Sequence, residues 1–299
     1  MIRFLIATCL ISIAIAEMPN RANADEQPTN LSYDRPRKLC ELEKDDIIES
    51  SGLAVSNFAA DRFWTHNDSG GKERLYAFDR SGKHLGTCKI DGAKVEDWED
   101  LASGIVDQEP MLLIGDVGDN QRKRDKCMIY LVKEPRDPTS EAKVHGRLSF
   151  SYEGGPVDCE ALAFDPLSRS ILLTEKTRLG SLGRGRVYQL QLPDDVSGKH
   201  KKLVAKSVGK TIVPTVTAMD ISRDGKFVVI GSYLDSMLYE RVPGEKWSET
   251  FSRNGRIVQM PVRRQGETIC FGLNNYDLFA TSEKHPTPFF EINAQPSSP

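Results

Sequence analysis

Short runs of apolar residues recur along this chain, and each is followed by a turn rich in Asp, Asn or Gly and then by a second apolar run. Runs of this length between turn residues are typical of β-strands. Alignment of the first run in each repeat gives five units, whose central apolar residues are separated by 48, 61, 57 and 50 residues. These central residues are Leu53, Leu101, Leu162, Met219 and Ile269. Repeats of this length indicate one structural unit that is used several times.

A third apolar run completes most units, for example at residues 75–78, 128–132, 187–192 and 237–240. No amphipathic helical pattern separates the units. Four-stranded units in direct succession are the blades of a β-propeller, so the sequence predicts an all-β fold with five four-stranded blades. Six blades are the alternative, if residues 245–261 contain a further unit.

The fifth unit ends after its third strand, at residues 288–292. We expect the N-terminal segment 37–43 to supply the missing outer strand and to close the propeller. Such closure removes two exposed sheet edges, which would otherwise pair with other chains. The propeller domain is therefore expected at residues 36–293, with flexible segments at 25–35 and 294–299, which are rich in Asn, Pro and Ser.

The first residues have the pattern of a secretory signal peptide. A 13-residue apolar run at 4–16 follows the single basic residue Arg3, and it is too short to span a membrane. Small residues suited to cleavage end at Ala16 and at Ala24, and the second site is preferred because a polar segment with Pro19 precedes it. We expect residues 1–24 to be removed and the product to be secreted or periplasmic, without a membrane span.

The composition is that of an ordinary globular protein. The chain has 299 residues, of which 39% are hydrophobic and 28% are charged. The formal net charge of -3, with both signs interspersed, argues against a nucleic-acid partner. The expected partners are a small-molecule substrate or a cell-surface ligand, and the expected state is a monomer.

Acidic residues gather where the first strand of several units begins and where the second strand ends. Glu99, Glu160 and Glu267 occupy the same place in three units, two residues before the central apolar residue. The start of one antiparallel strand lies beside the end of its partner, so both sets should meet on one face. Clustered oxygen atoms suit calcium or another hard divalent cation. The expected ligands are Asp68, Glu99, Asp100, Asp119, Asn120, Glu160, Glu175, Glu267 and Glu283.

Other interpretations of the acidic face remain open. An acid beside a turn also serves to accept backbone hydrogen bonds or to solvate a loop. Lys176, Lys284, Arg122 and Arg124 lie in the same stretches and are alternative counterions. If the face is catalytic, the candidate catalytic residues are Glu99, Glu160 and His66, of which His66 is either a base or a structural hydrogen-bonding group.

Four motifs carry a resemblance to known proteins: WTHNDSGG at 64–71, DWEDLA at 97–102, GDVGDN at 115–120 and QGETICF at 265–271. With them the chain resembles a group of secreted bacterial β-propeller proteins. In broader architecture it is similar to β-propeller phytases and to gluconolactonase and paraoxonase-type lactonases. That similarity implies a calcium site of Glu, Asp and Asn around the channel. Thr217, which stands at the Glu position of the fourth unit, departs from the lactonase pattern.

Two functions follow as hypotheses. The first is a metal-assisted hydrolase of a phosphoester, ester or lactone, of phytase-like or lactonase-like type. The second is a non-catalytic binding module of the cell surface or periplasm, in which the acids hold a structural cation.

Overall fold

The computed structural model describes residues 31–68, 70–178 and 185–296, and this part of the chain is almost entirely β-structure. Its one helix, α1 (Trp247–Thr250), has four residues. No helix in the described residues is long and apolar enough to cross a membrane. The signal peptide expected at residues 1–24 lies outside the described residues.

Most strands form groups of four, and each group follows the chain as an antiparallel meander. The first group contains β3 (Ser50–Val55), β4 (Arg62–Asn67), β5 (Arg74–Asp79) and β6 (His84–Asp91). The second contains β7 (Trp98–Val106), β8 (Glu109–Asp116), β9 (Cys127–Lys133) and β10 (Ala142–Tyr152). The third contains β11 (Cys159–Asp165), β12 (Ser170–Glu175), β13 (Gly185–Gln191) and β14 (Gly198–Thr211).

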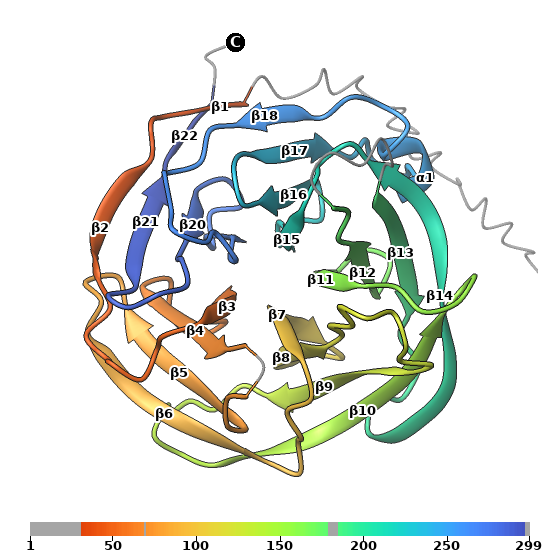
Figure 1. The fold of residues 1–299 in the computed structure, drawn as a ribbon, viewed down its shortest axis with the longest axis horizontal. Coiled ribbons are helices and arrows are strands. Elements are labelled where there is room, and N and C mark those ends of the chain that lie inside the picture. Colours follow the sequence, from red (N-terminus) through yellow and green to blue (C-terminus); the bar gives the residue numbers. More distant parts are fainter. Residues whose placement is uncertain (1–30, 69, 179–184, 297–299) are drawn as a thin grey trace, which may run out of the picture.

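Two further groups complete the described chain. The fourth contains β15 (Val216–Ile221), β16 (Phe227–Ser232), β17 (Ser236–Glu240) and β18 (Arg256–Val258). The fifth contains β19 (Cys270–Phe271), β20 (Leu278–Ala280) and β21 (Pro288–Ile292), and its fourth strand is the N-terminal β2 (Arg37–Glu41). In Figure 1 the groups surround a common centre, with β3, β7, β11 and β15 nearest to it and β2, β6, β10, β14 and β18 outside.

Hydrophobic cores lie between neighbouring groups. Each of the five buried apolar clusters combines side chains from two adjacent groups. One of them joins the fifth group to the first, where the ring of Phe63 packs against Phe279 and Phe289 with ring centroids 4.7 and 4.9 Å away. Burial of apolar surface on both faces of every group is therefore what holds the groups together.

The N-terminal strand β2 pairs with β21, as the sequence predicts. The carboxylate of Glu291, which is fully buried, accepts hydrogen bonds from Arg37 on β2 and from Arg80 of the first group. A buried carboxylate needs such partners because burial without them costs several kcal/mol, by an order-of-magnitude estimate. The pairing thus ties the start of the described chain to its last group and to its first.

Two expectations are corrected. Residues 31–33 and 294–296, which the sequence places in flexible ends, form β1 (Leu31–Tyr33) and β22 (Ala294–Pro296), which pair in an antiparallel sheet. The reason is apolar packing, since Leu31 is buried in the core between the fourth and fifth groups. Residues 245–261, where a sixth unit was the alternative, contain α1 and β18 and belong to the fourth group.

Outer strands also connect the first three groups. β10 pairs in parallel with β6 at one end and with β14 along most of its length, so that twelve strands form one continuous sheet. The fourth and fifth groups are separate four-stranded sheets.

Deletion of residues 37–43 should destabilise the whole described domain. It removes the ladder between β2 and β21 and one arginine partner of Glu291, so we expect the unfolding free energy to fall by about 2 kcal/mol or more. Thermal and urea unfolding of the mature chain measure this. A matched control is a chain that begins at Leu31, which keeps β2; equal melting of the deletion variant and the control would show that β2 is not structurally required.

Candidate functional site

The innermost strands share one irregularity. In four of the described groups the ladder between the first and second strand shifts register at the same place. The residue skipped by the ladder is Ser51, Glu99, Glu160 or Thr217. A β-bulge re-aims the side chain of its extra residue. Glu99 and Glu160 are therefore the bulge residues of their strands, whereas the third recurring glutamate, Glu267, precedes β19 (Cys270–Phe271).

The bulge residues fall into two kinds. Ser51 donates a hydrogen bond from its hydroxyl to the carbonyl of Glu99 in the next group at 2.7 Å, and Thr217 donates in the same way to Gly266 at 2.7 Å. These short side chains join neighbouring groups. Glu99 and Glu160 carry carboxylates at the same position, and these are buried, with 4% and 3% of each residue exposed.

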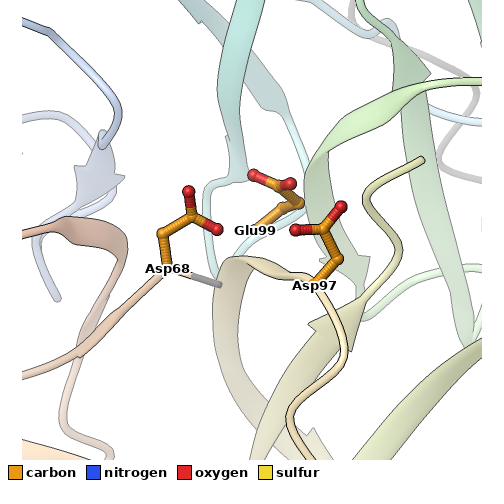
Figure 2. Close-up of side chains that lie close together, drawn as sticks. All are labelled: Asp68, Asp97 and Glu99. Atoms are coloured by element: carbon orange, nitrogen blue, oxygen red, sulfur yellow. The ribbon is translucent and has the colours of Figure 1, made fainter. Parts of the chain in front are cut away.

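Three carboxylates meet beside the first of these glutamates. Asp68 follows β4, while Asp97 and Glu99 lie at the start of β7, and one oxygen from each side chain lies within 4.8 Å of the others (Figure 2). Gly118, after β8, completes the site, because a Cβ atom there would overlap both Glu99 Oε1 and Asp97 Oδ2. The sequence GDVGDN thus supplies a position without a side chain where two carboxylate oxygens approach the backbone.

Further carboxylates from other groups interact with these three. The pKa of Glu99 is raised well above its usual range, first by burial and then by the charges of Glu160, Asp68 and Asp97. Burial, then Glu267 and other neighbours, raises the pKa of Glu283 to about 7. Acids from the first, second, third and fifth groups therefore share one electrostatic environment.

Lys176, after β12, is the most buried lysine of this environment, in which Arg124 and Lys284 also lie beside acids. Its Nζ lies 3.0 Å from Glu160 Oε2 and 5.1 Å from the centre of the Tyr233 ring. Burial lowers the pKa of Lys176, but the neighbouring Glu160 and Tyr233 outweigh this effect and keep the ammonium charged. Even so, burial and the other acids raise the pKa of Glu160 to about 7. One lysine does not neutralise the cluster.

One oxygen of Glu160 is left without a donor. Oε2 contacts Lys176, but Oε1 is enclosed and receives no hydrogen bond from any N–H or O–H of the described residues. Buried polar atoms almost always have a partner, so an enclosed carboxylate oxygen without one indicates a proton or a cation. Glu99 and Glu160 are close enough to share a proton through a side-chain hydrogen bond.

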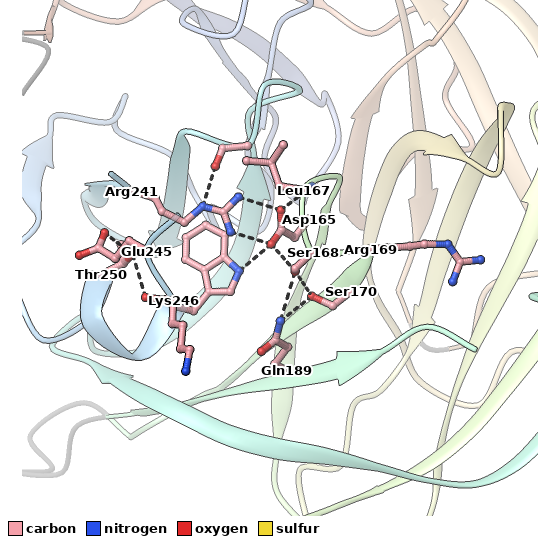
Figure 3. A network of polar contacts seen from close by, with 12 residues as sticks. Asp165, Leu167, Ser168, Arg169, Ser170, Gln189, Arg241, Glu245, Lys246 and Thr250 are labelled. Atoms are coloured by element: carbon pink, nitrogen blue, oxygen red, sulfur yellow. Dashed lines mark hydrogen bonds and ion pairs between the residues drawn. The ribbon is translucent and has the colours of Figure 1, made fainter. Parts of the chain in front are cut away.

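A second polar network in the molecule gives the contrast. Asp165, at the end of β11, accepts hydrogen bonds from Arg241 at 2.8 and 2.9 Å and from the Trp247 indole at 2.8 Å (Figure 3). Both of its oxygens are satisfied, and although burial acts to raise its pKa, hydrogen bonds from Arg241 and Ser168 keep it below the usual range. This network joins the third group to the fourth, and Arg241, Trp247 and Ser168 supply donors to the oxygens of Asp165.

Three of the expected ligands, Asp100, Asp119 and Glu175, are bound by backbone N–H groups or by arginine. Asp100 is fully buried and accepts backbone hydrogen bonds from Leu101, Leu162 and Met219. Asp119 accepts the backbone N–H of Arg124 at 2.7 Å, and Glu175 accepts Arg186 Nε at 3.1 Å. Asn120 is exposed and lines a pocket of about 250 Å³ with Arg122 and Lys176. The remaining ligands Glu267 and Glu283 contact Gln265 at 2.9 Å and Lys284 at 3.5 Å.

His66 lies behind the acidic cluster. It is fully buried, its ring meets that of Trp98 edge-on with centroids 5.5 Å apart, and its Nδ1 donates to the carbonyl of Asn67. Burial lowers its pKa to about 4, so the ring is neutral at physiological pH. The bond of Nδ1 is to a backbone carbonyl rather than to a neighbouring carboxylate, and Nε2 is enclosed without a hydrogen-bond partner among the described residues.

Two residues of the three-carboxylate site were absent from the expected ligand set. Asp97 lies outside the predicted ligand set, yet it joins Asp68 and Glu99. Burial, followed by the charge of Asp68, raises its pKa to about 6. Gly118 gave no signal beyond its place between two aspartates in GDVGDN.

The donor set fits a hard divalent cation. Calcium lies about 2.3–2.6 Å from its oxygen ligands, so ligand oxygens within about 5 Å of one another can share one ion. The spacing of up to 4.8 Å between Asp68, Asp97 and Glu99 meets this condition. An ion there would also lower the raised pKa values of the carboxyl groups, because positive charge favours their ionised form.

Comparisons with known proteins leave the chain without a family assignment. No protein-family model matches it, and no curated protein matches it in sequence. Among solved structures, hydrazine synthase from Kuenenia stuttgartiensis has 9% identity and a TM-score of 0.42, with 83% of this chain and 72% of that chain covered.

Two other solved structures are similar at the same level. A Bacteroides uniformis protein provisionally described as a 6-phosphogluconolactonase has 14% identity and a TM-score of 0.41, with 83% of this chain and 72% of that one covered. The Dos1 propeller has 11% identity and a TM-score of 0.36, with coverage of 81% and 67%. Likenesses of this size assign neither a fold nor an activity to the chain.

The acidic cluster predicts an unusual pH dependence in the presence of a chelator. Glu99, Glu160, Glu283 and Asp97 have raised pKa values in the folded state, so between about pH 4.5 and 7 the folded protein binds more protons than the unfolded chain. The unfolding free energy should therefore fall as the pH rises through this window. Denaturant unfolding at several pH values measures it.

The double variant Glu99→Gln and Glu160→Gln provides the control. Its neutral amides cannot ionise, so the slope of stability against pH should become shallower. A stability that rises steadily from about pH 5 to 7 in the parent protein would contradict the electrostatic assignment.

Proposed function

We propose that the protein is an exported five-bladed β-propeller, closed by β2, that binds calcium or a similar hard divalent cation through Asp68, Asp97 and Glu99. We further propose that this cation serves the hydrolysis of a phosphoester, ester or lactone. Export follows from the signal-peptide pattern at residues 1–24. The five groups and the cores between them support the propeller architecture.

The convergence of three carboxylates from two groups carries the cation proposal. Their oxygens lie within 4.8 Å of one another, and a residue without a side chain, Gly118, makes room for two of them. Each also has neighbours of like charge, which raises the free energy of the ionised cluster in the absence of a counterion. In the third group, Glu160 Oε1 receives no hydrogen bond from the described residues, so it too is an acceptor that a cation or a proton would satisfy.

The same residues suit hydrolysis. A bound divalent cation supplies a Lewis acid that polarises the scissile bond and lowers the pKa of water. Glu160, with a pKa near 7, can give or accept a proton close to neutral pH. Lys176 binds one oxygen of Glu160, and the other has no hydrogen-bond donor among the described residues. His66 has no part in this arrangement, because it is buried and its Nδ1 is bound to a backbone carbonyl.

A non-catalytic binding module is the second candidate, and Lys176 is the observation that favours it. Its ammonium group already compensates part of the acidic charge, as a structural cation would. In this case the ion bound by Asp68, Asp97 and Glu99 stabilises the loops that present a rim to a cell-surface ligand. Loss of the ion would then change stability and ligand binding without any reaction.

Calcium should raise the melting temperature of the chelator-treated protein. An ion that binds only the folded state adds about 2.7 kcal/mol at a hundredfold excess over its Kd. Glu99→Gln should weaken calcium binding about tenfold or more, and Gly118→Ala should do so by displacing Glu99 and Asp97. Calorimetric titration and thermal unfolding measure both effects.

The matched control for these variants is Asp194→Asn, which removes one exposed acid at a distant turn. It should bind calcium as the parent does. If the parent protein shows neither bound metal nor a calcium-dependent shift in melting, the cation proposal is wrong and the acids form a rim balanced by Lys176 and Lys284.

Hydrolysis is tested with the calcium-loaded protein on phosphomonoesters, carboxylic esters and lactones. Glu160→Gln should lower kcat for the accepted substrate about a hundredfold. Its melting temperature should fall by less than that of a variant with a substitution in the hydrophobic core. Calcium binding without turnover on any of the three substrate classes would reject the hydrolase and leave the binding module.

A further inference from the structure

The outer strand β14 is the most basic surface element of the described chain. Its 14 residues include five exposed lysines and no acidic residue. At about 3.3 Å per residue the strand extends over roughly 45 Å. We call these lysines the lysine strip; they are Lys199, Lys201, Lys202, Lys206 and Lys210.

The lysine strip lacks internal neutralisation. None of its members forms an ion pair with a described residue, whereas Lys89, Lys133 and Lys176 each pair with a glutamate. Two acids beside the strand are bound to its backbone or to the preceding turn: Glu153 accepts the N–H of Ser207, and Asp195 accepts that of Ser197. The net charge of the chain is -3, so the concentration of positive charge in the lysine strip is not explained by an excess of basic residues in the whole chain.

The backbone of β14 keeps these lysines accessible. The parallel ladder with β10 skips from the pair Leu148 and His200 to the pair Phe150 and Leu203, so Lys201 and Lys202 have no counterpart in that ladder. Lys202 has φ of 65°, a left-handed conformation that a residue with a Cβ atom seldom adopts. The bulge lets Leu203 and Ala205 pack inward while the lysines remain at the surface.

The neighbouring strand adds to the positive charge. Arg147 on β10 is the ladder partner of Lys199, and its guanidinium donates to the carbonyl of Gly92 without using a carboxylate. Positive groups therefore continue from β14 of the third group to the adjoining outer strand β10 of the second group. Charges placed along a line at the outer edge of a blade can contact a long, linear ligand at several points at once.

We propose that the lysine strip is a docking surface for a linear anionic polysaccharide, whose carboxylate or sulfate groups pair with successive ammonium groups. Lysine offers compact point charges without fixed geometry, which suits a repetitive polymer. β14 contains no Phe, Tyr or Trp on which nucleic-acid bases would stack. Val204 is its only exposed large apolar residue, which is too little to insert into a lipid surface.

The test measures binding of the mature protein, in chelator, to immobilised heparin and polygalacturonate, with neutral dextran as the uncharged polymer. We expect binding to both anionic polymers that weakens with added salt, and none to dextran. Substitution of the five strip lysines by Gln should weaken binding about tenfold or more at low ionic strength.

The matched control replaces five exposed lysines elsewhere by Gln, at Lys72, Lys83, Lys123, Lys126 and Lys246, and changes the net charge equally. It should bind within about twofold of the parent. A double variant, Lys199→Gln with Lys206→Gln, should show an intermediate loss if the five-lysine variant does not fold. Both variants should melt as the parent does.

Three results would overturn the proposal. These are absence of binding to both anionic polymers, an equal loss in the strip variant and the control, and tighter binding to single-stranded DNA or to vesicles of phosphatidylglycerol than to the polysaccharides at the same salt. Because all measurements are made in chelator, their outcome does not depend on whether Asp68, Asp97 and Glu99 bind a cation.

Discussion

The unpaired edge of each innermost strand is the constraint on which this structure depends. Such an edge presents backbone N–H groups that no neighbouring strand satisfies, and each needs an acceptor. The carboxylates of Asp100 and Asp220 are acceptors for some of these N–H groups. Asp100 accepts from Leu162 and Met219, and Asp220 accepts the N–H of Phe271 at 2.8 Å. Carboxylates of the second and fourth groups thereby bind the inner strands of the third, fourth and fifth groups.

Charge at the centre follows from this solution. Asp100 is fully buried and Asp220 is partly buried, and burial raises the pKa of Asp220 to about 7. At the acidic face the same strands bulge, and the bulge residue is either a hydroxyl that joins two groups or a glutamate. On β7 the two positions are adjacent: Asp100 accepts backbone hydrogen bonds from neighbouring groups, and Glu99, one residue earlier, lies in the three-carboxylate site.

The sequence predicted the parts that repeat. The spacing of apolar runs indicated four-stranded units, and the place of Glu99 and Glu160 before the central apolar residue indicated a shared position, which is a bulge. It did not predict which acids meet, because Asp97, Asp100 and Glu99 are neighbours in sequence and their roles depend on strand register. Nor did it predict the pairing of β1 with β22, since three-residue strands have no readable periodicity.

The parallel pairing of the outer strands divides the molecule into two kinds of repeat. Hydrogen bonds run without a break from β6 through β10 to β14, so none of the first three units can be exchanged or duplicated without leaving open sheet edges in its neighbours. The fourth unit has no strand ladder with those beside it. Gain or loss of one unit would therefore break fewer ladders between units at the fourth unit than at any of the first three.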